Sequence, residues 1–292
     1  MFESLIKKFK GSGTYDSLMC YSGGKDSTQT LSILKREFNL NILAVSIDNG
    51  FLSSQTFKNI RTVVETLGID HIYIKPRFDT LRKIFLDCAK NEIFSAKTIE
   101  RSSVICTSCM AIVKYSTLRV ALEKDIPFVV YGWSPGQAPI TSSIIKNNPQ
   151  MIKKMQNALY KPLYHIVGNE IKPYFLEEKH FTGSNRFPYY IHPLAFLDYN
   201  EKEIYQNIFL LGWRQPEDVD PNSTNCLLNS FANVVHKNAF GFHPYAYEMA
   251  NLVRESYIDR REALKRINQQ ENPSIIELVK NKLEGTSDSS NG

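Results

Sequence analysis

Short apolar runs alternate with helical patterns along the first two thirds of the chain. Five runs are apolar throughout or nearly so, at 18–21, 42–47, 71–74, 127–132 and 189–194. Between most of them, apolar residues recur every three or four positions, which is the spacing of one helix face. Continuous apolar strands separated by helices are typical of parallel sheets that are covered on both faces. The pattern therefore predicts an α/β fold with a doubly wound, mostly parallel, five-stranded sheet.

The same pattern divides the chain into regions. Residues 1–15 begin with an amphipathic helix, and residues 16–232 hold the strands and the helices between them. The periodicity breaks down at about 140–187, where lysines are interleaved with aromatic residues, and we expect a helical insertion that forms a lid or a substrate platform. This composition fits RNA binding as well as a solvated helix face. Residues 233–284 predict a helical C-terminal extension, and 285–292 a disordered polar tail.

Composition narrows the class of protein. The 292-residue chain has 42% hydrophobic and 22% charged residues, as an ordinary globular protein does. Its net charge of +5 fits a phosphate-rich small substrate or RNA without deciding between them. No uninterrupted apolar run approaches the roughly 18 residues of a membrane span, and no signal peptide is apparent, so we expect a cytoplasmic protein with no membrane partner. Five cysteines argue against a disulfide framework and direct attention to metal binding or sulfur chemistry.

A glycine-rich turn joins the first strand to the helix that follows it. Its residues are Ser22, Gly23, Gly24, Lys25, Asp26 and Ser27. Adjacent glycines let the backbone approach an oxyanion, and the next helix directs its free N–H groups and positive dipole end at the same place. Lys25 adds a positive charge, and Asp26 can hold Mg²⁺ or cap the helix. The turn is predicted to bind phosphate, although its spacing is not that of a Walker A loop.

Two further strand ends are expected at the same edge of the sheet. Asp48 follows the second strand, where a carboxylate can hold Mg²⁺ or hydrogen-bond a nucleotide, unless it is only a solvated turn residue. Gly132 ends the fourth strand, before a Pro- and Gly-rich loop at 133–139. We expect Asp48 and Gly132 to contact the nucleotide and the loop to form a wall of the site. His192, at the end of the fifth strand, is a candidate acid or base or a structural histidine.

Three cysteines are candidates for metal binding. Cys106 and Cys109 lie two residues apart at the start of a predicted helix, where their thiolates converge and the helix dipole favours the charged form. Cys226 lies far along the chain, in a loop expected at the same sheet edge. Three thiolates are one short of a closed structural site. His236 or His243 is a candidate fourth ligand, although a structural histidine is the commoner case. A redox pair, half of a zinc site and simple packing are the competing interpretations.

The turn at 22–27 resembles the Ser-Gly-Gly-x-Asp-Ser motif of the PP-loop ATP pyrophosphatases, which belong to the adenine nucleotide alpha hydrolase-like proteins with a Rossmann-like HUP fold. The resemblance implies that ATP binds there with Mg²⁺ and that pyrophosphate leaves as a carbonyl oxygen of a second substrate is adenylated. Together with Cys106, Cys109 and Cys226, the turn is similar to the iron–sulfur-dependent tRNA thiolases of the 2-thiocytidine type. This second resemblance, which covers about residues 16–232 in outline, implies a [4Fe–4S] cluster on the three cysteines whose open iron carries the sulfur.

Two features depart from the thiolases. The spacing from Cys109 to Cys226 is long, and residues 132–135 read Gly-Trp-Ser-Pro, where the thiolases tend to carry histidine and aspartate. This loop and the segments 240–245 and 260–264 resemble instead the N-acetyl-sugar amidotransferases, which are PP-loop enzymes. That resemblance implies an ATP-dependent amidotransferase that takes ammonia from a partner glutaminase.

The sequence thus predicts an AMP-forming, ATP-dependent sulfurtransferase that replaces a carbonyl oxygen with sulfur. Lys25, Asp26 and the three cysteines are the expected catalytic residues, and ATP, Mg²⁺ and a [4Fe–4S] cluster are the expected cofactors. The acceptor is a tRNA base or a small heterocycle, amide or sugar, and the sulfur donor is sulfide or a cysteine desulfurase. Without a cluster, ammonia or a cysteine persulfide is the nucleophile. The sequence is also compatible with a non-catalytic nucleotide-binding module or an RNA binder, and with a homodimer.

Overall fold

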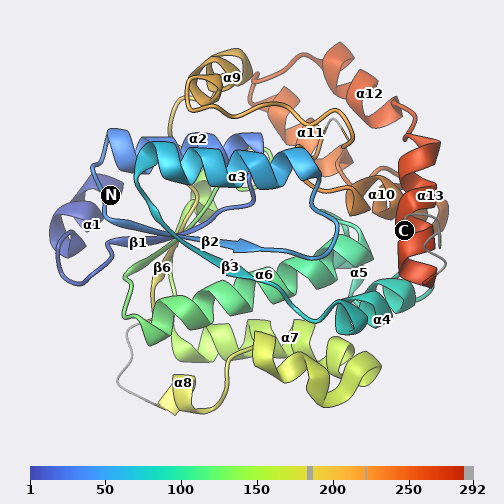
Figure 1. The fold of residues 1–292 in the computed structure, drawn as a ribbon, viewed down its shortest axis with the longest axis horizontal. Coiled ribbons are helices and arrows are strands. Elements are labelled where there is room, and N and C mark those ends of the chain that lie inside the picture. Colours follow the sequence, from blue (N-terminus) through green and yellow to red (C-terminus); the bar gives the residue numbers. More distant parts are fainter. Residues whose placement is uncertain (183–186, 221, 286–292) are drawn as a thin grey trace, which may run out of the picture.

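A six-stranded sheet with the strand order β3-β2-β1-β4-β6-β5 forms the centre of the molecule in the computed structural model (Figure 1), which describes residues 1–182, 187–220 and 222–285. The strands are β1 (Ser17–Cys20), β2 (Ile42–Ile47), β3 (Asp70–Ile74), β4 (Phe128–Tyr131), β5 (Ile144–Lys146) and β6 (Tyr189–Ile191). All neighbouring pairs are parallel except β5 with β6. This order confirms the predicted doubly wound, mostly parallel α/β fold.

The prediction of five strands was wrong by one. The five predicted strands correspond to β1, β2, β3, β4 and β6, and β5 is added at the sheet edge, where Ile145 pairs with Tyr190 in the antiparallel direction. β5 has only three residues, which is too short for a period-two pattern to stand out from its surroundings. Its pairing with β6 is a tertiary contact that the sequence does not announce.

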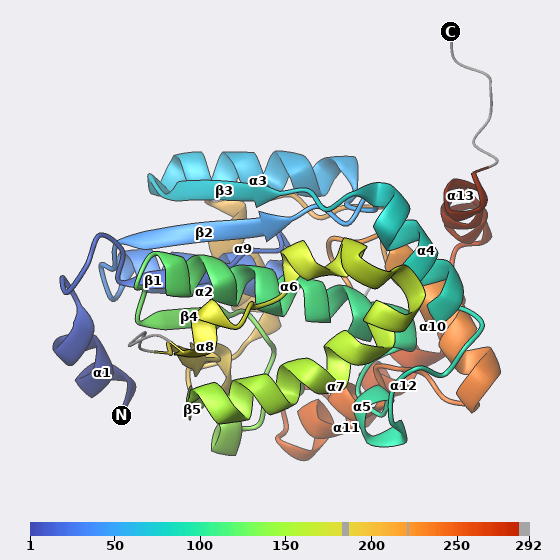
Figure 2. The same cartoon turned by 90° about the horizontal axis from the view of Figure 1, so that it is seen from below.

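Helices cover both faces of the sheet (Figures 1 and 2). The helices are α1 (Phe2–Phe9), α2 (Lys25–Arg36), α3 (Ser54–Leu67), α4 (Phe78–Cys88), α5 (Ala96–Ile99), α6 (Val104–Glu123), α7 (Pro149–Val167), α8 (Lys179–Thr182), α9 (Glu201–Phe209), α10 (Leu228–Phe240), α11 (Ala246–Arg254), α12 (Arg260–Asn268) and α13 (Pro273–Glu284), with short 3₁₀ turns at Ile140–Ser142, Gly168–Tyr174 and Pro193–Ala195. Helices α1, α2, α3 and α9 pack on one face, and α4, α6 and α7 on the other.

Each strand contributes side chains to both layers in alternation. In β1, Leu18 packs into the core beneath α6, while Met19 packs into the core beneath α2 and α3. Leu43 and Ala44 of β2 divide in the same way, and all four side chains are at most 2% exposed. Burial on both faces explains why these strands appear in the sequence as continuous apolar runs.

The main helix of the segment at about 140–187 is part of a structural layer, and a further role as a lid or substrate platform stays a prediction. This helix, α7, buries Ile152 and Leu163 completely in the core shared with α4 and α6. Lys153 of α7 pairs at the surface with Glu178, at 2.9 Å. The aromatic residues that suggested a binding platform therefore serve mainly to pack this layer.

Helix α6 occupies the middle of the molecule. It is 20 residues long and apolar enough to span a membrane by length and composition, although it contains no uninterrupted apolar run of that length. In this fold 56% of its most apolar window is buried within the protein, so the helix serves as a core element. The C-terminal helices α10 and α13 pack beside α6 and α4, and α10 runs across the domain boundary predicted at 232/233.

Candidate functional site

The turn predicted to bind phosphate lies between the carboxyl end of β1 and the start of α2. Gly24 is the N-cap of α2, and the hydroxyl oxygens of Ser22 and Ser27 are 3.0 Å apart across the turn. Gly23 has a φ of 76°, and a Cβ atom at this position would lie 2.6 Å from Cγ1 of Ile60. Both the left-handed backbone and the lack of space therefore require glycine here.

Two residues from a distant part of the chain, Trp213 and Thr224, contact this turn. Trp213 Nε1 donates a hydrogen bond of 2.9 Å to the carbonyl oxygen of Gly23. The backbone N–H of Lys25 donates to Thr224 Oγ1 at 2.9 Å, so the structure already satisfies one of the free N–H groups at the start of α2. Neither Trp213 nor Thr224 was predicted, because nothing in the sequence links residues almost 200 positions apart.

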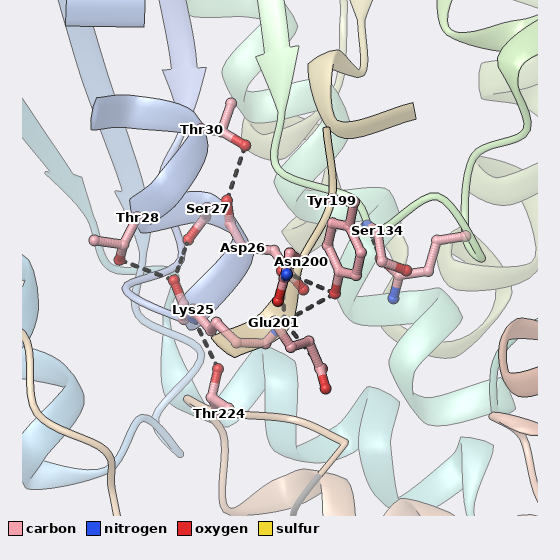
Figure 3. A network of polar contacts seen from close by, with 12 residues as sticks. Lys25, Asp26, Ser27, Thr28, Thr30, Ser134, Tyr199, Asn200, Glu201 and Thr224 are labelled. Carbon is pink, nitrogen blue, oxygen red and sulfur yellow. Dashed lines mark hydrogen bonds and ion pairs between the residues drawn. The ribbon is translucent and has the colours of Figure 1, made fainter. Parts of the chain in front are cut away.

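Lys25 lies in a buried network of charged groups (Figure 3). Its ammonium group is 2.6 Å from Asp26 Oδ1, 2.9 Å from the Tyr199 hydroxyl and 3.3 Å from Glu201 Oε1. Burial alone would lower the pKa of Lys25, but Asp26, Tyr199 and Glu201 raise it well above its ordinary value. Lys25 is thus a permanent cation, held by two carboxylates, at the start of α2.

Arg266 of the C-terminal extension completes this network. Its two terminal nitrogens contact the two carboxylate oxygens of Glu201, at 3.1 and 2.6 Å. Burial alone would raise the pKa of Glu201, but Arg266 and Lys25 hold it below its ordinary value. The extension is therefore tied to the phosphate turn through Glu201 and Lys25. The sequence placed Glu201 only in the first turn of a helix.

Gly132 brings β4 into contact with the phosphate turn. A Cβ atom at Gly132 would lie 2.4 Å from the Cα atom of Ser27, and backbone at that distance leaves no room for a side chain. The observed role of Gly132 is this close packing, and its predicted contact with a nucleotide stays a prediction.

Asp48 fixes the turn after β2. One carboxylate oxygen accepts the backbone N–H of Gly50 at 2.8 Å, and the other lies 3.4 Å from the ammonium group of Lys75. Asp48 is buried next to the cysteine region, and its charge is one of the influences that raise the pKa of Cys226. Its predicted role in binding nucleotide or Mg²⁺ stays a prediction.

Glu248, on α11, is a further acidic group that the sequence interpretation missed. It accepts a hydrogen bond of 2.6 Å from the hydroxyl of Ser134, in the loop after β4. Burial raises the pKa of Glu248 to about 7, and the nearby charge of Asp26 contributes to the rise. Asn251, one turn further along α11, donates to the carbonyl oxygen of Gly136 at 2.7 Å. The extension thus holds the loop that was predicted to form a wall of the site.

The three candidate cysteines lie beside this edge of the sheet. The Nδ2 atom of Asn49, in the turn after β2, is 3.5 Å from Cys109 Sγ and 3.4 Å from Cys226 Sγ. Cys106 lies one turn before Cys109 on α6, and its Sγ atom is 3.6 Å from Asn229 Oδ1. All three thiols are free. Asn49 thus brings Cys109 and Cys226 to one place, and the predicted convergence of all three sulfur atoms stays a prediction.

Local structure fixes each cysteine in place. Ser103 caps α6 and accepts the backbone N–H of Cys106 at 3.0 Å, which sets the start of the helix. Cys226 forms an isolated antiparallel bridge with Leu52, after β2. Because Thr224 caps α2 only two residues before Cys226, one short loop links the phosphate turn to the thiols.

The pKa values of the three thiols and the side chains around them bear on whether they could bind a metal ion or an iron–sulfur cluster. Burial raises the pKa of Cys106 and Cys109 to about 12 and also raises that of Cys226, so a positive charge is needed to form the thiolates. No three His, Cys, Asp or Glu side chains within the described ranges are arranged to hold a single metal ion. Three thiols, two of which receive amide N–H donation, are one ligand short of a closed zinc site, and an iron–sulfur cluster on them stays a prediction.

The two histidines proposed as a fourth ligand take other roles. His236 packs its ring against Phe240 and Phe242, with centroids 4.6 and 4.8 Å away. His243 accepts the backbone N–H of Tyr245 through Nδ1 and faces Glu271 with Nε2, at 3.8 Å. Neither joins two cysteines in a metal-binding group in the part of the chain that the structure describes, and a role as a fourth ligand stays a prediction.

A lysine and a histidine face each other near the ends of β4 and β6. The ring of His192 stacks on that of Trp133, with centroids 4.5 Å apart and planes 8° apart. Burial, followed by the charge of Lys114, lowers the pKa of His192 to about 4, so its imidazole is neutral near pH 7. The Lys114 ammonium lies 5.2 Å above the ring of Tyr190, and burial lowers its pKa to about 8. Lys114 is another candidate that the sequence did not suggest.

Comparison with known proteins gives distant similarities. No family model matches the chain. A curated protein of Methanocaldococcus jannaschii, described as uncharacterized protein MJ1599, is 23% identical over 274 residues, which cover 94% of this chain and 80% of that protein.

Among solved structures, the U34-tRNA thiolase NcsA of Methanococcus maripaludis, solved with its [4Fe–4S] cluster, has a TM-score of 0.42 at 16% identity, over 97% of this chain and 78% of that one. The ammonia-dependent NAD synthetase of Campylobacter jejuni has a TM-score of 0.41 at 15% identity, over 98% and 91%. The NMN synthetase of Francisella tularensis has a TM-score of 0.34 at 14% identity, over 82% and 92%.

Proposed function

We propose that this protein is an ATP-dependent sulfurtransferase. In this proposal, ATP binds with Mg²⁺ at the turn 22–27, a carbonyl oxygen of the acceptor attacks the α-phosphate, and pyrophosphate leaves. Sulfur then displaces AMP from the adenylated acceptor, which becomes a thiocarbonyl compound. The observation that carries the proposal is that one loop, at 224–226, caps the phosphate turn through Thr224 and places Cys226 against Asn49, which also contacts Cys109.

The residues of the turn have distinct roles in this mechanism. The N–H groups at the start of α2 and the charge of Lys25 stabilise the negative charge that develops on the phosphates, an effect that can contribute several kcal/mol. Asp26 and Glu201 place two carboxylates beside that charge. Carboxylates next to a phosphate site repel it unless a divalent cation lies between them, which is the arrangement that Mg²⁺ favours. Asp26 is therefore the proposed Mg²⁺ ligand.

The three cysteines are the proposed ligands of a [4Fe–4S] cluster, with Asn49 as a hydrogen-bond donor to two of the sulfur atoms. Such a cluster supplies an iron with an open position, which can hold the sulfur to be transferred. The chain's own contribution is to hold Cys106, Cys109 and Cys226 in place through Ser103, Leu52 and the loop at 224–226. The sulfur donor is proposed to be sulfide or a cysteine desulfurase, and the acceptor a tRNA base or a small heterocycle or amide.

The test measures iron and acid-labile sulfide, with the visible absorption spectrum, after anaerobic reconstitution. About four irons and four sulfides per chain are expected for the wild type. Cys106→Ala, Cys109→Ala and Cys226→Ala are each expected to lose them, while the control Cys20→Ala, which changes a cysteine inside β1, should retain them. A wild type that takes up no iron under these conditions would overturn the cluster and the sulfur transfer that depends on it.

One observation favours a second function, an ATP-dependent amidotransferase supplied by a glutaminase. The loop after β4, which resembles that of amidotransferases, contacts α11, the helix between the two C-terminal segments of the same resemblance at 240–245 and 260–264. These contacts join Ser134 to Glu248 and Gly136 to Asn251. In that case ammonia would displace AMP, and the cysteines would have no catalytic part. ATP-dependent release of pyrophosphate with ammonium and a sugar amide, and without iron, would support this function over the first.

A further inference from the structure

The hydroxyl groups of the phosphate turn itself are used mainly within the turn. Ser27 Oγ and Thr28 Oγ1 both donate to the carbonyl oxygen of Gly24, at 3.0 and 2.8 Å. Ser22 Oγ lies 3.0 Å from Ser27 Oγ and can donate its own proton to that oxygen. A hydroxyl carries a single proton, so in this arrangement these three side chains have no proton left to donate to a ligand.

Thr224 brings a further hydroxyl to the same place from a distant loop (Figure 3). Its Oγ1 atom accepts the backbone N–H of Lys25 at 2.9 Å, and its own proton has no acceptor among the residues that the structure describes. A Cβ atom at Gly24 would lie only 3.0 Å from this oxygen, so the second glycine of the turn leaves the hydroxyl its room. Thr224 is partly exposed and thus presents a free O–H donor at the positive end of α2.

Contacts of the next residue hold Thr224 in this position. The carbonyl oxygen of Asn225 accepts the backbone N–H of Ser53 at 3.2 Å and the hydroxyl of Thr56 at 3.0 Å. The side-chain Nδ2 atom of Asn225 donates to the carbonyl oxygen of Ser22 at 3.3 Å. The loop is therefore tied both to the start of α3 and to the phosphate turn, and withdrawing it would break several hydrogen bonds at once. The Thr224 hydroxyl is a preorganised group, not part of a mobile flap.

We propose that Thr224 is a phosphate-binding residue of the ATP site, whose O–H donates to an oxygen of the triphosphate while its Oγ1 keeps the N–H of Lys25. The proposal deepens the sulfurtransferase function and rests on the binding of ATP at the turn 22–27. A hydrogen bond to a charged phosphate oxygen is stronger than one between neutral groups, and a donor already held in place loses little entropy on binding. The triphosphate is then recognised by the turn and also by the loop that carries Cys226.

The test is isothermal titration of the full chain with ATP and Mg²⁺. Thr224→Val removes the hydroxyl, keeps the shape of the side chain and is expected to weaken ATP binding about tenfold, because a hydrogen bond to a charged group is lost. Thr224→Ser, which keeps the hydroxyl, should bind ATP as tightly as the wild type. Ser223→Ala is the matched control, since it removes the adjacent hydroxyl, whose partner is Asn225 Oδ1 at 3.4 Å, and should not change the affinity.

The sign of the change in Thr224→Val decides between two arrangements. If a phosphate oxygen instead displaces Thr224 Oγ1 from the N–H of Lys25, the variant should bind ATP more tightly, and tighter or unchanged binding would overturn the proposal. An equal loss of affinity in Thr224→Ser would also overturn it, because the hydroxyl would then not be the binding group. A wild type that binds no ATP would overturn both this inference and the ATP-dependent function. Iron content does not involve the Thr224 hydroxyl, so it reports separately on sulfur transfer.

Discussion

Asp26, Lys25, Glu201 and Arg266 form a chain of contacts in which the charges alternate, from the phosphate turn to the C-terminal extension. Each of them is at least partly buried, where an unpaired charge would be costly. Glu248 has no such cation within contact distance among the described residues, and its partner is the neutral hydroxyl of Ser134. Two glutamates at the same sheet edge thus have shifted pKa values of opposite direction, lowered for Glu201 and raised for Glu248. The type of residue alone does not indicate this difference.

The free energy of unfolding of the wild type is expected to fall as the pH rises through the pKa of Glu248. The variant Glu248→Gln is expected not to show this fall. Burial raises the pKa of Glu248 in the folded protein from 4.5 to about 7, so the unfolded chain releases this proton first. The stability that protonated Glu248 contributes is fully present below about pH 4.5 and is lost by about pH 7. The loss is roughly 3 kcal/mol of the free energy of unfolding. Urea unfolding of both proteins at a series of pH values measures it.

The control for this experiment is Glu255→Gln, which changes an exposed carboxylate at the end of the same helix. Its pH dependence should follow that of the wild type. If Glu248→Gln loses as much stability as the wild type between pH 4.5 and 7, Glu248 does not carry the effect.

At the scale of elements, the site depends on how closely β4, α2 and the loop at 222–226 approach one another. Gly132 allows the end of β4 to touch the backbone of Ser27, and Thr224 caps α2. Because Cys226 is two residues from Thr224, the position of α2 and the position of the third thiol are linked through a few covalent bonds. Disturbing the contact between β4 and α2 should therefore affect the phosphate turn before it affects the cysteines.

Gly132→Ala is expected to cost about 2–3 kcal/mol of unfolding free energy and to weaken binding of ATP with Mg²⁺ at least about tenfold. The reason is that the new Cβ atom would lie 2.4 Å from Ser27 Cα and 2.7 Å from Ser27 N, and backbone cannot give way cheaply. Urea unfolding and isothermal titration measure the two effects. Gly13→Ala is the control, since its nearest atom would be 4.0 Å away. Unchanged ATP affinity in Gly132→Ala would show that this contact does not shape the turn.

At the scale of the molecule, the C-terminal extension is fastened to the nucleotide-binding half at two points near the same site. Arg266 of α12 binds Glu201 of α9, and Glu248 of α11 binds Ser134 after β4. Helix α10, which runs into the extension, also places Asn229 Oδ1 3.6 Å from Cys106 Sγ. The helices that look like an appendage in the chain order are thus part of the walls of the site (Figure 1).

A double-mutant cycle with Arg266→Met and Glu201→Gln measures this coupling. We expect an interaction energy of about 1–2 kcal/mol in urea unfolding, because the contact is two-point and only about a fifth of each side chain is exposed. The exposed pair Arg61 and Glu65 on α3 is the matched control and should give at most about 0.5 kcal/mol. Equal coupling energies for the two pairs would mean that the extension is not fastened at this point.

The sequence by itself determined the sheet, its parallel direction and the positions of the phosphate turn and the cysteines. Buried strands and amphipathic helices are local patterns, and the carboxyl ends of parallel strands must meet at one edge. It did not indicate β5, because three residues carry no readable period, nor that α7 packs into the core.

Only the tertiary structure decided which groups meet. That Lys25 is held by Glu201, that Asn49 contacts Cys109 and Cys226, and that α10 places Asn229 against Cys106 are contacts between segments far apart in the chain. Such contacts depend on how layers of helices pack, which is a property of the whole surface of each element and not of any short motif. The same packing sets the pKa of Glu248, since burial is not a property of an isolated residue.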